Sequence, residues 1–390
     1  MMKEEIRYKE RKNSNCEKWD GLLEEYGRND LLPVWVADMD FEAASCVKEA
    51  LQEYIDFNVY GYYHVPDSFY DSIISWEEKY QGYFVEKDWI RIIPGVVPTI
   101  YWLVQMWTKK EESVLIMPPV YYPFFNAVKQ TDRRLVECPL CKDGESYTMN
   151  LELFEKKIQE ENVKVFILCS PHNPVGRVWR KEELQAVLDI CKKYGIYVIA
   201  DEIHQDIIMS GYQKITAAVC GDYDENLITL TSVSKSFNLA GFQCAYAIIP
   251  SEKNRQAYDK VMQKIHITET TNFSYIVMQA VYEKGRPWLE GVCEIIESNY
   301  EYLKTELKKV LPEVKIAPLE GTYLAWLDMS AYIEPEWMKQ TLLEECHLAV
   351  DFGEWFGGEM YKSHIRLNLA TSRKNMEEVV RRMAMVKKEA

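Results

Sequence analysis

The sequence predicts an α/β protein built on a mostly parallel sheet. From about residue 90, short apolar segments rich in β-branched residues alternate with longer amphipathic segments of helical periodicity. Turn-forming residues bound most of the short segments and limit them to the length of a strand. This alternation is typical of strands joined by helices that cross back over the sheet.

Five of the short segments are expected to be buried strands. They cover residues 114–117, 164–169, 197–200, 227–230 and 244–249. A helix is predicted over 182–194, and its apolar face includes Leu184 and Leu188. Gly195 follows directly, and glycine commonly ends a helix because it tolerates a left-handed conformation. Each such helix would return the chain across the sheet.

The pattern changes after residue 286. A long charged helix is predicted from about 287 to 310, followed by short strands near 315–317, 322–327 and 364–369. We therefore expect a large domain over 46–286 and a smaller α+β domain formed by 1–45 and 287–390. No linker rich in glycine or serine separates them, so the two parts should pack rigidly.

Charge and composition exclude several classes of partner. The chain has 390 residues and a formal net charge of −15, from 46 Lys and Arg against 61 Asp and Glu. This charge repels nucleic acid and anionic membranes, so neither is expected as a partner. The charged N-terminal sequence lacks the hydrophobic core of a signal peptide, and no apolar run reaches the roughly 18 residues of a spanning helix. We expect a cytoplasmic protein.

The ten cysteines are interpreted as free thiols in a reducing compartment, because most lie in apolar stretches. Cys138 and Cys141 have the C-x-x-C spacing of some zinc and redox sites. They lack a second ligand pair and a strand-to-helix setting, so a structural role is favoured. No metal site is predicted.

Polar side chains follow four of the predicted strands. Tyr121, Asn173, Asp201 and Lys235 each come shortly after a buried segment, and His204 lies close behind Asp201. Ligands of α/β proteins bind at the carboxyl ends of the strands, so these residues should converge. An amine, a carboxylate, an amide and an aromatic ring are the groups that pyridoxal 5'-phosphate (PLP) requires.

At these residues the sequence resembles the fold-type I PLP enzymes of the class I and II aminotransferase superfamily. The shared elements are Asn-Pro-x-Gly at 173–176, Asp-Glu at 201–202 and Ser-x-Ser-Lys at 232–235. The sequence is most similar to the cystathionine β-lyase or C–S lyase branch, the MalY/PatB-like group. Its marks here lie at 32–41, 201–204, 235–241, 321–328 and 366–370. The resemblance implies a three-layer large domain with a mostly parallel sheet, plus the smaller α+β domain.

The resemblance also implies roles around the cofactor ring. Lys235 would carry PLP as a Schiff base and move the Cα proton of the substrate. Asp201 would pair with the pyridine nitrogen, and Tyr121 would stack on the ring. Asn173 and His204 would flank the phenolic oxygen. Each of these residues has a structural alternative, such as a core histidine at 204 or a core tyrosine at 121.

The phosphate of the cofactor would lie at a glycine turn that begins a helix. The resemblance assigns Gly95, Val96, Val97, Ser232 and Ser234 to this site, and a helix N-terminus suits an anion. Many members of the superfamily carry an arginine where this chain has Gln243. Phosphate binding would therefore depend on neutral donors. Tyr60 would reach the phosphate of a neighbouring subunit, which implies a homodimer with shared active sites.

On the substrate side, Arg366 resembles the arginine that binds the α-carboxylate of an amino acid through a bidentate fork. Its alternative is a structural salt bridge. The resemblance assigns Ala37, Asn173 and Tyr121 to the substrate as well, and places Trp35 and Asp38 nearby. Residues 353–357 resemble a loop over the mouth of the site, without an assigned role.

The expected reaction is α,β-elimination from L-cystathionine or a related L-cysteine S-conjugate, which yields a thiol, pyruvate and ammonia. This expectation rests on the branch that the sequence resembles, because Lys235, Asp201 and Arg366 would serve transamination equally well. An aminotransferase acting on an amino acid and a 2-oxo acid is the first alternative. A regulatory role that binds another protein, with or without catalysis, is the second.

Overall fold

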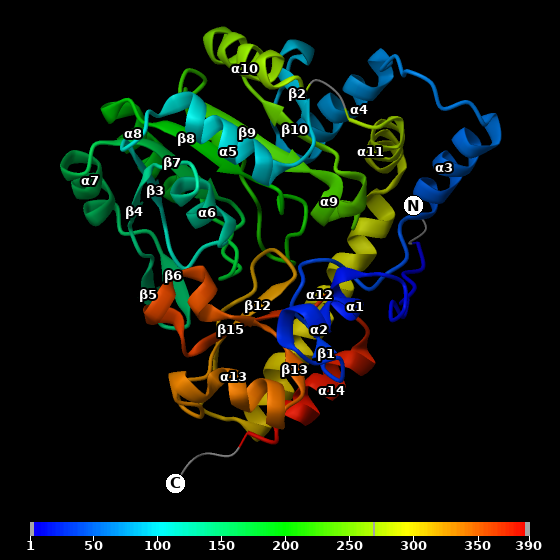
Figure 1. Cartoon of the computed structure of the whole chain (residues 1–390), viewed down its shortest axis with the longest axis vertical. Coiled ribbons are helices and arrows are strands. Elements are labelled where there is room, and N and C mark those ends of the chain that lie inside the picture. Colours follow the sequence, from blue (N-terminus) through cyan, green and yellow to red (C-terminus); the bar gives the residue numbers. More distant parts are fainter. Residues whose placement is uncertain (1–3, 268–269, 387–390) are drawn as a thin grey trace.

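A seven-stranded sheet organises the larger part of the chain (Figure 1). The computed structural model describes residues 4–267 and 270–386. In spatial order the strands are β2 (Ile90–Ile93), β10 (Ala245–Ile248), β9 (Leu227–Ser232), β8 (Tyr197–Asp201), β7 (Val163–Cys169), β3 (Ser113–Ile116) and β4 (Arg134–Glu137). Strand β10 runs antiparallel to both neighbours, and the other pairs are parallel. The predicted mostly parallel sheet is confirmed.

The sequence prediction missed the two edge strands, β2 and β4. Both are only partly buried, and β4 has a single buried position, Val136, instead of a continuous apolar run. The five central strands are buried on both faces and were predicted within a few residues of their ends. Continuous apolar runs thus identify the centre of this sheet better than its edges.

Helices cover both faces of the sheet, which gives three layers. Successive residues of β7 face opposite sides, with Val165 and Ile167 in one core and Phe166 and Leu168 in the other. The first core is closed by α5 (Val96–Trp107), α6 (Pro123–Lys129) and α10 (Glu252–Ile265). The second is closed by α7 (Leu151–Glu160), α8 (Lys181–Tyr194) and α11 (Asn272–Lys284), with α4 (Asp67–Trp76) packed against α11.

The C-terminal part has a smaller antiparallel sheet. The 25-residue helix α12 (Arg286–Val310) leads into it, and α14 (Arg373–Met383) packs against α12. In spatial order its strands are β11 (Lys315–Ile316), β12 (Leu324–Asp328), β15 (His364–Asn368) and β14 (Asp351–Phe352). A smaller α+β unit follows the large sheet, as predicted.

The N-terminal segment lies beside this C-terminal part (Figure 1). It contains α1 (Glu17–Asp20), α2 (Leu22–Tyr26) and β1 (Leu32–Pro33), and β1 pairs in parallel with β13 (Leu348–Ala349). The α-helices and strands not yet named are α3 (Ser45–Phe57), α9 (Val233–Ser236), α13 (Met338–Gln340) and the hairpin of β5 (Cys141–Asp143) and β6 (Ser146–Thr148). The exact domain limits stay a prediction, and residues 1–3, 268–269 and 387–390 of those domains lie outside the described residues.

All ten cysteines are free, and eight of them are buried. Cys141 is exposed on β5 and Cys138 is buried, so the C-x-x-C pair forms no disulfide. Across residues 4–267 and 270–386, no helix is both long enough and apolar enough to cross a membrane.

Candidate active site

Four neighbouring strands of the large sheet end in the predicted site residues. Lys235 follows β9, Asp201 ends β8, Asn173 follows β7 and Tyr121 follows β3. These strands are adjacent in the order β9-β8-β7-β3 and run in parallel. The carboxyl ends of parallel strands meet at one edge, so the structure brings these residues together as expected.

Lys235 lies on the one-turn helix α9 directly after β9. Its Nζ donates a hydrogen bond to the carbonyl oxygen of Ala37 at 2.6 Å. Burial lowers the pKa of Lys235 to about 8, with Arg366 acting in the same direction and Asp38 and Asp201 opposing it. A larger share of this amine is therefore neutral near pH 7 than in an exposed lysine. A neutral amine can act as a nucleophile and as a base.

Asp201 is a buried carboxylate with few partners. Its Oδ1 accepts the backbone N–H of Ile203 at 3.1 Å. Burial raises the pKa of Asp201 to about 7, although the Ile203 N–H and the Lys235 charge oppose this shift. A carboxylate in this state gains much from a cationic N–H group placed against it.

His204 is buried, and its Nδ1 has no hydrogen-bond partner within the described part of the chain. Burial lowers its pKa well below the usual value, and the charges of Lys235 and Arg366 add to this effect. The imidazole is therefore neutral at physiological pH. Tyr323 contacts it edge-on at 5.6 Å between ring centroids, and the Tyr323 hydroxyl donates to the Ala37 carbonyl at 2.7 Å.

Arg366 is fully enclosed on β15. Its NH1 donates to Asn173 Oδ1 at 3.0 Å, and its NH2 donates to the Trp35 carbonyl at 3.2 Å and to the Asp351 carboxylate. The guanidinium also lies over the Phe356 ring, 5.0 Å from its centroid. Its Nε has no partner among the described residues. The structure thus gives Arg366 a buried ion pair and leaves Nε as a buried donor without a partner among the described residues.

Tyr323 and Asp351 are two site residues that the sequence analysis did not single out. Tyr323 lies within the 321–328 segment that carries the family resemblance. The resemblance therefore marked this segment but assigned no role to Tyr323. Asp351 lies opposite Arg366 in the register of β14 and β15. Strand β14 has two residues, and an isolated strand of that length produces no recognisable periodic pattern.

The ring of Tyr121 lies at the edge of the site. Burial raises the pKa of its hydroxyl, so the phenol stays neutral. Tyr122 contacts it with ring centroids 5.3 Å apart. The backbone N–H of Val120 donates to the Phe356 carbonyl at 2.9 Å, which fastens the 353–357 loop next to this segment. The loop therefore contacts the segment that precedes Tyr121, and its place over the mouth of the site stays a prediction.

The predicted phosphate site begins at the turn before α5. Gly95 is the residue that precedes this helix, and Val96 and Val97 form its first two positions. Backbone N–H groups in the first turn of a helix have no partner inside the helix and favour an anion. The proline at 98 reinforces the start, because its missing N–H costs nothing there.

The two serines before Lys235 lie at the same end of the sheet. Ala245 on β10 pairs with Ser232 on one side and with Ile93, near the Gly95 turn, on the other. The Ser232 hydroxyl donates to the Cys244 carbonyl at 2.7 Å and caps α9 by accepting the Ser234 N–H at 2.9 Å. Ser232 is thus committed to local bonds, and the phosphate roles of both serines stay predictions.

Tyr60 lies apart from these residues, on the connection between α3 and α4. Its side chain is 53% exposed, and its hydroxyl donates to the Ile55 carbonyl at 3.4 Å. Phe57, Val59 and Tyr62 beside it are also exposed. Within one chain the structure therefore does not bring Tyr60 to the site.

The side chains at the strand ends fit PLP. Asp201 has no ion pair with any described residue, which suits the ring nitrogen, and a partly buried lysine with a lowered pKa suits a carbonyl carbon. The unpartnered Nδ1 of His204 is available to a polar atom of a bound group. The start of α5 offers N–H groups to a phosphate.

Known proteins match nearly the whole chain. The family described as aminotransferase class I and II matches residues 31–383. Cystathionine beta-lyase PatB of Bacillus subtilis is 33% identical over 378 residues, which are 96% of this chain and 97% of that protein. Cystalysin from Treponema denticola, crystallised with PLP, has a TM-score of 0.94 and 32% identity, with 99% of each chain covered. A PLP-bound C–S lyase from Staphylococcus hominis has a TM-score of 0.91 and 31% identity, covering 98% of this chain and 97% of that one.

Proposed function

The chain belongs to the class I and II aminotransferase family, and from this premise we propose that it cleaves the Cβ–S bond of L-cystathionine or a related L-cysteine S-conjugate. This α,β-elimination consumes one water and yields a thiol, pyruvate and ammonia. The expected family, its C–S lyase branch and PLP as the cofactor are confirmed by relatives that match nearly the whole chain. The identity of the thiol conjugate is the finer part of the proposal.

The observation that carries the PLP chemistry is the grouping of Lys235, Asp201 and Arg366 at the strand-end site, and the choice of elimination over transamination is supported by the C–S lyase relatives. When bound, PLP supplies an electron sink that stabilises negative charge on the Cα of an amino acid. Asp201 would hold the ring nitrogen, because no cation of residues 4–267 and 270–386 pairs directly with its buried carboxylate. The other cofactor contacts would come from Tyr121, Asn173, His204, Gly95, Val96, Val97, Ser232 and Ser234.

Lys235 is the proposed base of the reaction. Its pKa of about 8 lies near the pH at which the protein would work, so the amine can both take up and release a proton. Lys235 would remove the Cα proton of the substrate and deliver it to the sulfur that leaves from Cβ. Proton transfer by a positioned side chain of this kind contributes roughly 10²- to 10⁴-fold to a rate.

Arg366 is the proposed anchor of the substrate. Its Nε has no partner among the described residues and can donate to an α-carboxylate. Asn173 fixes the guanidinium from one side and Asp351 fixes it from the other. Held this way, the carboxylate would direct Cα toward Lys235, and Ala37 and Tyr121 would line the same space.

A homodimer with shared sites is also part of the proposal. The exposed aromatic segment around Tyr60 supports it, because such a patch is a common feature of protein interfaces. Co-expression of a Tyr60→Ala chain with a Lys235→Ala chain tests it. If Tyr60 serves the neighbouring site, mixed dimers contain one complete site and regain activity that neither variant has alone. Mixed dimers without activity would contradict the shared site.

A cytoplasmic location and a small-molecule substrate complete the proposal. Ten free cysteines, most of them buried, support a reducing compartment. The net charge of −15 disfavours nucleic acid as a partner.

Pyruvate release from L-cystathionine by the purified protein with PLP, in the absence of any 2-oxo acid, tests the reaction. We expect many turnovers, with thiol and pyruvate formed in equal amounts. L-Methionine is the matched control, because its sulfur lies one carbon further from Cα and cannot leave from Cβ. A yellow, PLP-loaded protein that releases no pyruvate from any cysteine S-conjugate would overturn the proposal, and activity with 2-oxoglutarate would then identify an aminotransferase.

A further inference from the structure

Residues 36–39 form a short segment, here named the carbonyl loop, that lies against the proposed base. The carbonyl oxygen of Ala37 accepts the Lys235 amine at 2.6 Å and the Tyr323 hydroxyl at 2.7 Å. Both donors share one oxygen. The position of this carbonyl therefore decides where the Lys235 amine rests when it has no covalent partner.

The carbonyl loop is tied on two sides by asparagines. Asn368 on β15 donates from Nδ2 to the carbonyls of Val36 and Asp38, at 2.6 Å each. Asn238, just beyond α9, accepts the Met39 N–H and donates to the Met39 carbonyl, both at 2.9 Å. These bonds fix the peptide planes of the loop but leave the charge of the Asp38 side chain to another partner.

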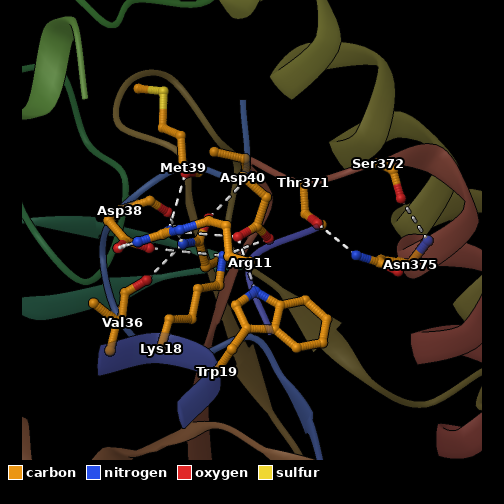
Figure 2. Close-up of polar contacts among 12 residues, drawn as sticks. Arg11, Lys18, Trp19, Val36, Asp38, Met39, Asp40, Thr371, Ser372 and Asn375 are labelled. Carbon is orange, nitrogen blue, oxygen red and sulfur yellow. Dashed lines mark hydrogen bonds and ion pairs between the residues drawn. The ribbon is translucent and has the colours of Figure 1, made fainter. Parts of the chain in front are cut away.

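Arg11 supplies the nearer of two cationic partners, the other being Lys18, whose Nζ lies 3.9 Å from Asp38 Oδ1 (Figure 2). Its NH2 donates to Asp38 Oδ2 at 2.7 Å, and its NH1 donates to the Met39 carbonyl at 3.1 Å. The guanidinium thus binds a carboxylate and a backbone carbonyl of the same loop. A planar guanidinium holds such a pair in a fixed geometry, which a lysine ammonium does not.

A buried ion pair anchors the chain next to the carbonyl loop. Lys18 and Asp40 are both fully buried, with Nζ and Oδ2 2.8 Å apart. Trp19 Nε1 donates to the other oxygen of Asp40 at 3.0 Å. Figure 2 shows Lys18 and Trp19 approaching from α1, next to Arg11. The N-terminal segment therefore braces the carbonyl loop at two points.

We propose that Arg11 is a positioning residue that acts on Lys235 through the carbonyl loop. Arg11 sets the place of the loop by its two hydrogen bonds and sets the effective charge of Asp38 by its ion pair. Both the place of the loop and the charge of Asp38 act on Lys235. The Ala37 carbonyl accepts a hydrogen bond from the Lys235 amine, and Asp38 is the residue after Ala37. The role concerns this lysine in any reaction, and its kinetic consequence rests on the proposed elimination.

The charged and titratable groups that face Lys235 come from separate elements. They are Asp38 of the carbonyl loop, Asp201 of β8, His204 of the following loop, Tyr323 before β12 and Arg366 of β15. The two aspartates favour the charged amine, and Asp38 acts more strongly than Asp201. Arg366 opposes them, while His204 and Tyr323 are neutral. A change in the charge at Asp38 should therefore reach the amine.

Two variants with opposite effects on charge test the proposal. Asp38→Asn removes the negative charge, and Arg11→Met removes the nearer of its two counter-ions, because Lys18 Nζ remains 3.9 Å from Asp38 Oδ1. Arg382→Met is the matched control, because Arg382 also bridges a carboxylate, Glu378, and a carbonyl, that of His347, at similar exposure but on α14. Acetylation of the full chain freed of PLP, over a range of pH and read by mass spectrometry of the Lys235 peptide, measures the protonation of this one amine.

We expect the protonation midpoint of Lys235 to fall by about one pH unit in Asp38→Asn and to rise by about half a unit in Arg11→Met. Arg382→Met should leave it unchanged. Midpoints that move in the same direction in the two variants, or that do not move, would overturn the proposal. If Arg11→Met does not fold, Asp38→Asn and Arg11→Lys replace it in the test. Arg11→Lys retains the positive charge, so it should keep the wild-type midpoint of Lys235.

The kinetic readout separates positioning from a structural role. Arg11→Met should lower kcat about 3- to 10-fold and leave KM within about 2-fold, because Arg11 lies outside the proposed substrate contacts. Arg11→Lys should recover part of the loss. A raised KM with unchanged kcat would contradict positioning. The wild-type protein could lack lyase activity while the Lys235 midpoint still shifts as expected in the variants. That result would contradict the proposed reaction and would still support the positioning role of Arg11.

Discussion

Two adjacent carboxylates at the end of β8 lie in opposite kinds of surroundings. Asp201 faces the strand-end site, where one backbone N–H binds it. Glu202 faces a buried polar cluster, where its two oxygens accept Lys214, the Thr216 hydroxyl at 2.5 Å and the Ala217 N–H at 2.8 Å. Both carboxylates are buried to nearly the same degree. They differ in whether the chain itself provides the positive partner.

The difference indicates which buried charge belongs to structure and which to function. Glu202 has a complete set of donors, as structural buried ions do. Burial raises the pKa of Asp201 to about 7, which means that the charged carboxylate is unfavourable in the folded protein. Only an external cation would offset this free-energy cost. A ligand with a cationic N–H would give Asp201 the positive partner that Lys214 gives Glu202.

The largest effect is expected for Lys235→Ala. This change removes the proposed base and the amine that would carry the cofactor, so pyruvate release should fall by about 10³-fold or more. Stability should change little, because the lost hydrogen bond is the one to Ala37. A pyruvate assay and a thermal melt measure the two effects. Lyase activity close to that of the wild type would remove Lys235 from the mechanism.

Asp201→Asn should come next and should separate function from stability. The neutral amide cannot pair with a cationic ring nitrogen, so kcat should drop by roughly 10²-fold or more. The protein without cofactor should be at least as stable as the wild type above pH 7, since an uncompensated buried charge is gone. Denaturant unfolding without PLP measures this. A clear loss of stability would show that Asp201 is structural.

Glu202→Gln is the matched change on the other side of the comparison. It leaves the Lys214 ammonium buried without a carboxylate, so the free energy of unfolding should fall by about 3 to 5 kcal/mol. The kcat of the folded protein should stay within a few-fold of the wild type. Unchanged stability together with a large loss of kcat would reverse the roles assigned to the two carboxylates.

The smallest effect is expected from Glu77, a buried carboxyl outside the site. Its Oε1 accepts the Tyr246 hydroxyl at 2.6 Å and the Gln205 amide at 2.8 Å, and burial raises its pKa to about 7. The folded state thus holds this proton more tightly than the unfolded state. The resulting stability is fully present below about pH 4.5 and is lost as the pH rises through about 7.

Glu77→Gln should weaken that pH dependence. The difference in unfolding free energy between about pH 5 and about pH 8 should shrink by about 2 kcal/mol. Urea unfolding at both pH values checks this. An unchanged difference would mean that Glu77 does not titrate in this range.

The comparison also explains what the sequence could predict. Local apolar runs such as 163–169 predict the central strands and the polar residues at their ends. The burial of such a run does not depend on distant partners. Asp351 and Arg11 were missed because their contacts join residues 15 and 27 positions apart without any periodic pattern. The difference between Asp201 and Glu202 is invisible in sequence for the same reason, since Lys214 reaches Glu202 from a loop. The role of Tyr60 depends on a second chain, which no local pattern describes.

Borohydride reduction of the purified yellow protein, followed by peptide mass spectrometry, tests most directly whether the strand-end site is the catalytic site. The reagent fixes PLP to the amine that carries it. The expected result is a phosphopyridoxyl group on the peptide that contains Lys235, and its absence from Lys214, a buried lysine that pairs with Glu202 just after β8. A modified lysine anywhere else, with an unmodified Lys235, would contradict the site.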